Sequence, residues 1–338
     1  MDLNTLWFVL IAVLLGVYAV LDGFDLGTGI LYPLLGRANE EKRALLQSIG
    51  PFWDANEVWL LTAGGALFAA FPVAYASVFS SFYLAVILLV FALVARAVAT
   101  EFRGAVPDAA WQRWWDRLFF LGSLLASFIF GVALGNIARG IPVDAGQHYT
   151  GTFWGLLNPY ALLFGLAGVV AFTMQGAAYG MLKLTGVLAE RARRLGSATA
   201  PFVLFLNAAL TAYTWVEQPR LFTNFQADHI LYLIPGVMVA ALLLAWWQIA
   251  SGRPGLAFAF SSLTLASMVA TVAASLYPYL VPAFDPAASL TIYNAASSAL
   301  TLKVMLAIAL SGLPFVIFYT AYVYRVFRGK TRLGTEGY

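Results

Sequence analysis

Long stretches of apolar residues recur along the whole chain, and charged residues gather between them. A helix needs about 20 predominantly apolar residues to cross the hydrocarbon of a bilayer. No stretch shows the alternation of apolar and polar residues that is typical of barrel strands. The pattern therefore predicts an all-α membrane protein with nine transmembrane helices in bundles. Their expected ranges are 6–33, 52–75, 77–99, 117–138, 158–183, 199–217, 230–250, 255–277 and 301–326.

The basic residues predict the orientation of these helices, because cytoplasmic loops are enriched in Lys and Arg. With the N-terminus outside, 16 of the 19 Lys and Arg residues fall in inner segments, and the outer segments hold only Arg139, Arg220 and Lys303. The inner group ends with a basic tail that includes Arg332. The start MDLNT lacks the positive region of a cleavable signal peptide. We therefore expect a retained first helix, an outer N-terminus and a cytoplasmic C-terminus.

Composition narrows the class further. Of the 338 residues, 62% are hydrophobic and 10% charged, so the apolar surface would be buried in lipid and not in one soluble core. We expect residues 1–338 to form a single integral-membrane subunit. The chain has no cysteine, which excludes disulfides, thiolate metal sites and iron–sulfur clusters. The basic stretch at 190–194 is an orientation signal, and no basic domain outside the membrane predicts nucleic-acid binding.

Four carboxylates lie where a membrane protein usually avoids them. Asp22 and Asp25 fall inside the first apolar stretch, and Asp54 and Glu57 open the second. Each pair is spaced i, i+3, so both members share one helix face. An ionisable group costs about 2.5 kcal/mol or more at the centre of a membrane helix and indicates function by default. Two such pairs predict a proton or cation route.

Helix depth predicts where the four carboxylates meet. A helix that enters from outside near residue 5 places Asp22 about 25 Å and Asp25 about 30 Å along its axis. Asp54 and Glu57 start the next helix from the same inner side, so all four are expected to converge near the cytoplasm. Small residues allow close helix packing, and five glycines are predicted to provide it: Gly23, Gly27, Gly29, Gly64 and Gly65.

Simpler interpretations of the same residues stay open. Asp54 and Glu57 follow Pro51 at a helix start, where acidic side chains cap free amides and favour the helix dipole. Asp25 could instead pair with a basic residue of the next loop: Arg37, Lys42 or Arg43.

Other charged and aromatic residues have ordinary explanations. Trp111, Trp114 and Trp115 are typical of an inner membrane interface. Arg96, Glu101 and Arg103 are expected to pair with one another or with the carboxylates. Glu217 is predicted at a solvated helix end or at a subunit contact.

The residues that could bind haem are poorly placed. The only histidines, His148 and His229, fall in outer segments, so no histidine pair inside the bilayer can ligate a haem. A lone methionine is usually a packing residue, and this applies to Met174, Met181, Met238, Met268 and Met305. We expect no metal site in this chain. Any electron transfer would need a partner that carries the metals.

Several strings resemble subunit II of cytochrome bd-type quinol oxidases. They are DGFDLGTG, GPFWDANEVWLLTAGGALFAAFPVAYA, RAVATEFR and SSALTLKVMLAIALSGLPFVIFYTAYVYRVF. The similarity spans nearly the whole chain, and the block that begins WDANEVWL is long and specific. Ala55 stands where the family pattern usually has Gly.

The resemblance implies a haem-free subunit of a respiratory oxidase that oxidises quinol and reduces dioxygen to water. The larger subunit I would hold haem b and haem d, and this chain would have no catalytic residue of its own. Asp54 matches a proton-pathway carboxylate, Asp22 and Asp25 match the DGFD pair, and Trp59 matches a tryptophan near an apolar dioxygen path. A bound quinone or lipid, a small accessory subunit and a bacterial or archaeal cytoplasmic membrane also fit the resemblance.

Two alternatives are kept beside this interpretation. A purely structural or assembly subunit needs none of the four acids to titrate. A proton-coupled secondary transporter would also use carboxylates within the membrane, although such folds often carry paired broken helices and the sequence has no second copy of the first helix.

Overall fold

The computed structural model describes residues 2–331, and the predicted basic residue Arg332 lies outside them. Twelve α-helices dominate these described residues, and one small two-stranded sheet accompanies them. The α-helices are α1 (Leu3–Leu35), α2 (Asn39–Ile49), α3 (Trp53–Ala70), α4 (Pro72–Ser81), α5 (Tyr83–Phe102), α6 (Ala109–Arg139), α7 (Pro159–Lys183), α8 (Gly186–Glu217), α9 (Thr223–Ala227), α10 (Leu233–Ala250), α11 (Pro254–Leu276) and α12 (Ala299–Val326).

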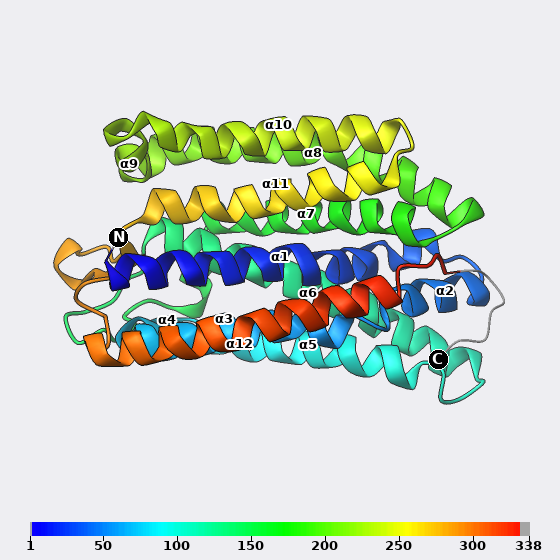
Figure 1. Cartoon of the computed structure of the whole chain (residues 1–338), viewed down its shortest axis with the longest axis horizontal. Helices are drawn as coiled ribbons and strands as arrows, with labels where there is room; N and C mark the ends of the chain where they lie inside the picture. The colour runs from blue at the N-terminus through cyan, green and yellow to red at the C-terminus, as the bar shows by residue number, and fades with distance from the viewer. Residues whose placement is uncertain (1, 332–338) are drawn as a thin grey trace.

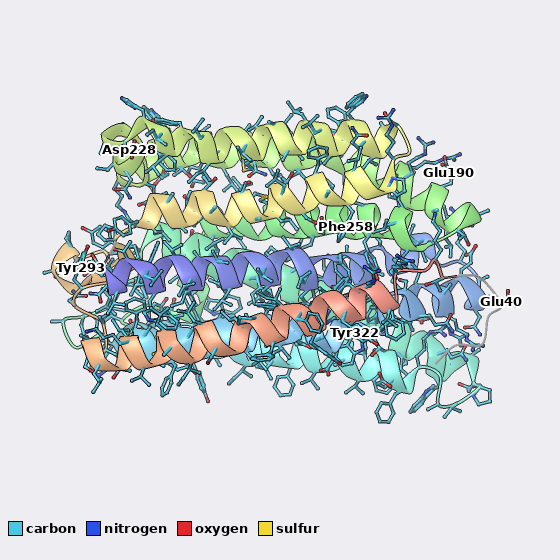
Figure 2. The ribbon with its side chains drawn as sticks, in the orientation of Figure 1. Glu40, Glu190, Asp228, Phe258, Tyr293 and Tyr322 are labelled. Atoms are coloured by element: carbon cyan, nitrogen blue, oxygen red, sulfur yellow. The ribbon has the colours of Figure 1, made fainter. Side chains whose placement is uncertain are left out.

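Long helices run side by side along one direction of the molecule (Figure 1). The central helix α1 contacts α3, α6, α7 and α11. Figure 1 shows α1 beginning at the left end of the bundle and α12 ending toward the right. In Figure 2, Glu40 and Glu190 lie at the right end, whereas Asp228 and Tyr293 lie at the left end. Charged side chains thus mark the two ends of an apolar bundle.

Eight helices within residues 2–331 are long and apolar enough to cross a membrane. Nine were predicted, and the predicted helix at 52–75 is the one that does not meet this requirement. Its counterpart α3 has only 18 residues and carries Asp54, Asn56 and Glu57 near its start. The chain leaves the helical conformation at Phe71, directly before Pro72. Proline disfavours a helical residue before it and lacks an N–H donor. The predicted break near residue 76 was therefore wrong, and the ninth crossing stays a prediction.

The predicted starts of two helices were wrong, although both helices lie where the sequence placed them. α6 begins at Ala109 and not near 117, because the Asp108 side chain accepts a hydrogen bond from the Trp111 amide at 2.7 Å and caps the helix. α8 begins at Gly186 and not near 199. Its first turns are charged, and Glu190 pairs there with Arg193 and Arg194 at 2.8 and 2.9 Å. Such i, i+3 and i, i+4 pairs extend a helix beyond its apolar part.

The sequence pattern missed the shortest elements. α2 is an amphipathic helix between α1 and α3, and no apolar run marks it. One antiparallel hairpin joins β1 (Tyr279–Val281) to β2 (Leu290–Thr291). The 3₁₀ turns are η1 (Phe153–Leu156), η2 (Pro219–Phe222), η3 (His229–Tyr232) and η4 (Pro286–Ala288). The prediction of a helical membrane fold is confirmed, with this hairpin as the addition.

Glycines set the distance between α1 and its neighbours. A Cβ on Gly27 would lie 1.9 Å from the Phe172 carbonyl oxygen of α7, and one on Gly29 would lie 2.0 Å from Ser123 Oγ of α6. Gly23 similarly faces the Phe172 ring. The predicted close packing of these three is confirmed. For Gly64 and Gly65 it was wrong, because a Cβ would meet nothing within 4 Å in this chain; both belong to α3, most of which lies at the surface of the chain.

Candidate functional site

An ion pair lies in the middle of the bundle, between α1 and α5. Arg96 Nη1 donates to Asp22 Oδ1 at 2.8 Å. Asp22 is 0% exposed and Arg96 1%. Arg96 is one of the largest side chains that are fully buried in this protein. A buried charge is costly unless it is paired, so the pair explains how both groups are tolerated at this depth.

The start of α3 brings two more polar groups to this pair. Glu57 Oε2 lies 3.5 Å from Arg96 Nη2. Asn56 Nδ2 donates to Asp25 Oδ2 at 2.7 Å and lies 3.3 Å from the Leu21 carbonyl oxygen. Asp25 and Asn56 are both 0% exposed. We call Asp22, Asp25, Asn56, Glu57 and Arg96 the central cluster.

The end of α12 completes the hydrogen bonds of Asn56. The Tyr324 hydroxyl donates to Asn56 Oδ1 at 2.9 Å, and its ring stacks on Phe52 with centroids 4.5 Å apart. Lys183 fixes this helix end, because its ammonium donates to the Phe327 carbonyl oxygen and lies 4.9 Å from the Phe52 ring centroid. Segments far apart in the sequence thus meet at the central cluster.

Several polar atoms at this place have no hydrogen-bond partner among the described residues. They are Tyr18 OH, Asp22 Oδ2, Asp25 Oδ1, Arg96 Nε and Arg96 Nη2, five of the nine such atoms found. Buried polar atoms are normally paired, and each exception needs a physical reason. The cluster also holds three carboxyl groups and a single guanidinium. It therefore has unused capacity to bind hydrogen-bonding molecules and protons.

The structure does not bring Asp54 into the cluster. Asp54 is exposed at the surface of the chain, in the first turn of α3. The residue at the helix N-cap is Phe52, and no side chain caps the helix with a hydrogen bond. The capping interpretation is therefore limited to the favourable effect of Asp54 on the helix dipole. Three of the four predicted carboxylates meet, and Asp54 stands outside them.

Trp59 lies one turn further along α3 and is 8% exposed. It packs in an apolar cluster with Leu14, Tyr18 and Ala63. The Tyr18 ring makes an edge contact with Phe130 at 5.3 Å between centroids. The central cluster therefore borders an apolar region on the side of Tyr18 and Trp59.

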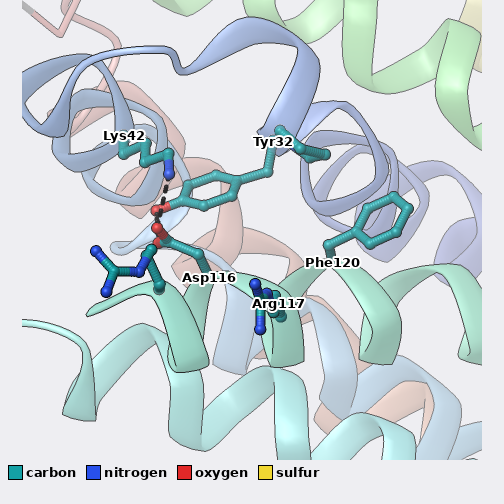
Figure 3. A pocket seen from close by; sticks show the side chains of 7 residues that line it. Tyr32, Lys42, Asp116, Arg117 and Phe120 are labelled. Carbon is teal, nitrogen blue, oxygen red and sulfur yellow. Dashed lines mark hydrogen bonds and ion pairs between the residues drawn. The ribbon is translucent and has the colours of Figure 1, made fainter. Parts of the chain in front are cut away.

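A second charged cluster lies between α1, α2 and α6. Asp116 Oδ1 accepts from Arg103 Nε at 2.5 Å and from the Tyr32 hydroxyl at 2.7 Å, while Oδ2 accepts from Lys42 Nζ at 2.7 Å. Figure 3 shows Lys42 and Tyr32 directed at the Asp116 carboxylate. Arg103 also donates to Asn39 Oδ1 at 2.8 Å. We call Tyr32, Lys42, Arg103 and Asp116 the interface cluster.

The interface cluster answers one open question from the sequence. Lys42 pairs with Asp116, and Asp25 is bound to Asn56, so the predicted alternative that Lys42 pairs with Asp25 was wrong. Arg37 donates its backbone amide to Glu41 Oε2 at 2.7 Å. Within residues 2–331, neither Arg37 nor Arg43 forms an ion pair with Asp25.

The remaining predicted residues lie away from both clusters. His148, His229, Glu101 and Glu217 are exposed. Within the part of the chain that the structure describes, no group of three or more His, Asp or Glu side chains is placed to hold a metal ion. An apolar groove of about 940 Å³ runs along α1 and α11, and its lining includes Asn224, Asp228 and Tyr277.

Sequence reasoning missed four members of this site. Asn56 stands between two acidic residues in the WDANEVW block, and an uncharged polar residue beside them was the available signal. Tyr18 lies four residues before Asp22, so helical spacing on the same face could have found it. Tyr324 gave no local signal, because it meets Asn56 only through the tertiary fold. Asp116 lay in a segment interpreted only through its tryptophans.

The fold and the central cluster define a multi-pass membrane protein with ionisable groups buried between its helices. Residues 3–327 match the family described as cytochrome bd terminal oxidase subunit II. The chain belongs to this family and is a subunit of a terminal oxidase, which confirms the resemblance found in the sequence. A second subunit of the oxidase is implied by that description.

Relatives from three bacteria illustrate the similarity. The chain is 37% identical to cytochrome bd-I ubiquinol oxidase subunit 2 of Escherichia coli (strain K12), with 95% of this chain and 93% of the relative covered. It is 36% identical to a probable cytochrome oxidase subunit 2 of Haemophilus influenzae, covering 97% and 95%, and 38% identical to cytochrome bd ubiquinol oxidase subunit 2 of Bacillus subtilis, covering 97% of each chain.

The fold is also that of a solved oxidase. A chain in the structure of bd oxidase from Geobacillus thermodenitrificans superposes with a TM-score of 0.80 at 17% sequence identity. The match covers 97% of this chain and 99% of that chain.

Proposed function

We propose that this chain is the haem-free subunit II of a quinol:dioxygen oxidoreductase, and that it supplies part of the cytoplasmic proton pathway to the oxygen-reducing site. The larger subunit I would hold haem b and haem d and would oxidise quinol. The names of the relatives, which are ubiquinol oxidase subunits, support this assignment. The exposed positions of both histidines agree with haem that is bound by the partner.

The proposed topology has nine crossings, with the N-terminus outside and the C-terminus in the cytoplasm, in one integral-membrane unit of residues 1–338. An odd number of crossings is supported by the positions of α1 and α12, since α1 begins at one end of the bundle and α12 ends toward the other (Figure 1). The eight helices that meet the length and hydropathy requirement leave α3 as the further crossing. Basic residues concentrated in the inner segments support the orientation.

The proton pathway rests chiefly on one observation, the burial of Asp22 and Asp25 in the central cluster at 0% exposure. Protons cross a low-dielectric interior only through titratable groups and the water that joins them. Glu57 is partly exposed, with a side-chain accessibility of 20%, and Asp54 is exposed nearby on the same helix. We assign proton entry to Asp54 and Glu57, and inward transfer to Asp25 and Asp22.

Partner and ligand surfaces follow from the same fold. α12 is the least covered of the eight candidate spans, with 6% of its apolar window buried, and α5 follows with 17%. We assign the contact with subunit I to this side of the molecule. The groove along α1 and α11 has the volume and apolar lining for a quinone or lipid tail.

Trp59 keeps its proposed place beside an apolar dioxygen path. Its contacts with Leu14 and Ala63 also suit simple packing. Replacement by Phe separates the two roles. A raised KM for dioxygen with an unchanged unfolding temperature would support the path, whereas an unchanged KM would leave packing as the role of Trp59.

The decisive experiment is the Asp25→Asn substitution in the assembled complex. Asparagine keeps the shape of the side chain but cannot carry a proton, so quinol-dependent oxygen uptake should fall by about tenfold or more, while the haem spectrum stays intact. Glu217→Gln is the matched control and should leave uptake unchanged, because Glu217 is exposed at the end of α8, away from α5 and α12 (Figure 1).

The other outcomes identify the alternatives. Full turnover in Asp25→Asn would favour a purely structural subunit. Loss of all haem would make Asp25 an assembly residue. Purification without haem or a larger partner would favour a proton-coupled transporter.

A further inference from the structure

The unpaired atoms of the central cluster do not lie at random. Tyr18 and Arg96 both lie near Asp22, and the Tyr18 hydroxyl approaches the Asp22 carboxylate without a hydrogen bond of normal geometry. Asp25 follows one turn further along α1. We propose that these atoms bind a group of internal water molecules that joins Asp25 to Asp22 in the proton pathway, and that the Tyr18 hydroxyl holds this group in place. This inference rests on the proposed function and adds a residue and a ligand to it.

Burial shows what kind of molecule can satisfy these atoms. Asp22 and Asp25 are 0% exposed, Arg96 is 1% and Tyr18 is 4%. These values refer to this chain alone, so a side chain of subunit I has no access to the atoms. Leaving a buried polar group unpaired costs about 1–3 kcal/mol. Apart from contacts of these atoms with one another, only a small molecule enclosed by this chain can pair them.

The mixture of donors and acceptors selects water over a metal ion. Arg96 Nε and Nη2 only donate hydrogen bonds, the carboxylate oxygens accept them, and a tyrosine hydroxyl does both. A cation would be attracted by the carboxylates but repelled by the guanidinium. A water molecule donates to Asp22 and accepts from Arg96 at the same time. Each buried water makes about 2–4 hydrogen bonds. The five polar atoms can serve as partners for a small group of such waters.

The position of Tyr18 marks one end of the water group. Tyr18 lies four residues before Asp22, one turn closer to the start of α1. Its ring packs against Phe130 and in the apolar cluster of Trp59 and Leu14. The phenol is therefore the last polar group before the apolar region. The Tyr18 hydroxyl can donate to one water and accept from another, so it orders the waters that pass a proton from Asp25 to Asp22.

The Tyr18→Phe variant of the complex tests the role of the hydroxyl. It keeps the ring and its contact with Phe130, and it removes only the hydroxyl beside Asp22. We expect an unchanged haem spectrum and unfolding temperature, an oxygen uptake about tenfold lower, and a larger solvent deuterium isotope effect on uptake. A packing role would leave the isotope effect unchanged. Tyr75→Phe is the matched control, because Tyr75 stacks on Phe79 in α4, away from the cluster.

Comparison with Asp25→Asn separates this inference from the proposed function. Slow uptake in both variants supports both. Slow uptake in Asp25→Asn with normal uptake in Tyr18→Phe overturns the role of Tyr18 and leaves the proton pathway standing. Normal uptake in Asp25→Asn overturns the pathway, and the role of Tyr18 falls with it.

A cryo-electron microscopy map of the complex that resolves ordered water tests the ligand directly. Density within hydrogen-bond distance of Tyr18 OH, Asp22 Oδ2 and Arg96 Nε is the expected result. A metal ion at this place would overturn the inference. Direct contacts that pair Arg96 Nε and Asp25 Oδ1 with other protein groups would also overturn it.

Discussion

The central and interface clusters use the same kinds of side chain in opposite ways. In the interface cluster one carboxylate, Asp116, accepts from Tyr32, Lys42 and Arg103, and both of its oxygens are bound. In the central cluster Asp22 and Glu57 pair with one guanidinium, Asp25 is bound only by Asn56, and five polar atoms have no hydrogen bond within the described residues. A fully satisfied network holds helices in fixed positions. An unsatisfied one needs water, which is what proton transfer requires.

Burial follows the same division. The side chains of Lys42 and Asp116 are 23% and 10% exposed, whereas those of Arg96 and Asp22 are 2% and 0% exposed. Solvent can form hydrogen bonds with the interface cluster from outside, whereas only enclosed water can form them with the central cluster. The comparison predicts that damage to the interface cluster affects stability alone, and that damage to the central cluster affects turnover as well.

The largest effect is expected from Arg96→Gln. Removal of one partner from a buried ion pair leaves an uncompensated charge and costs about 3–5 kcal/mol, here on Asp22. The fraction of chain assembled into complex and the unfolding temperature should both fall. Adding Asp22→Asn should recover part of the loss, because the double variant has no unpaired Asp22 charge. A single variant that assembles and unfolds like the unmodified complex would mean that Asp22 is neutral and that the pair contributes little.

Gly27→Ala should disturb both clusters together. Gly27 lies on α1 between Asp25 and Tyr32, and its new Cβ would lie 1.9 Å from the Phe172 carbonyl oxygen. α1 would have to move away from α7, at a cost of about 1–3 kcal/mol or more. We expect a lower unfolding temperature together with lower turnover. Gly16→Ala is the control on the same helix, because a Cβ there meets nothing within 4 Å. Equal unfolding temperatures for the two variants would contradict the packing argument.

The sequence predicted the carboxylates of the central cluster but not its full membership. Asp22, Asp25 and Glu57 could be found because a charge within an apolar stretch is conspicuous, and helical spacing placed each pair on one face. The same spacing could not say which face of α3 meets α1. For that reason Asp54 was grouped with the others, although the structure leaves it exposed.

Tertiary contacts explain what the sequence could not provide. Arg96 was named as a partner of the carboxylates in general, and its choice of Asp22 depends on how α5 lies against α1. Tyr324 is 268 residues from Asn56 along the chain. The apolar spans themselves were predictable, since α1, α7 and α11 lie within three residues of their expected ends. The interrupted helix at Phe71 was not, because the apolar pattern continues through Pro72.

Asp116→Asn tests the comparison between the two clusters with an expected effect of intermediate size. Asparagine keeps one acceptor oxygen but loses the charge that binds Lys42 and Arg103, and hydrogen bonds to charged groups contribute about 1.5–3 kcal/mol. The unfolding temperature of the complex should fall by less than in Arg96→Gln, because Lys42 can turn to solvent. Oxygen uptake per haem should stay normal. Reduced uptake per haem would give the interface cluster a part in proton transfer and would remove the division between the two sites.

The smallest effect on stability is expected from Tyr32→Phe. The closest comparison sets this variant beside Tyr18→Phe. Both tyrosines belong to α1 and both are buried, at 1% and 4% exposure. The Tyr32 hydroxyl donates to the Asp116 carboxylate at 2.7 Å, so its removal should cost about 1.5–3 kcal/mol, the value for one hydrogen bond to a charged group, and leave uptake per haem unchanged. The Tyr18 hydroxyl lies beside Asp22 without a hydrogen bond of normal geometry, so its removal should leave the unfolding temperature unchanged and slow uptake. Thermal unfolding and oxygen uptake measured on the same two preparations test this reversal. If Tyr32→Phe slows uptake as much as Tyr18→Phe does, both hydroxyls act through the position of α1, and the proposed water at Tyr18 is not needed to explain the loss.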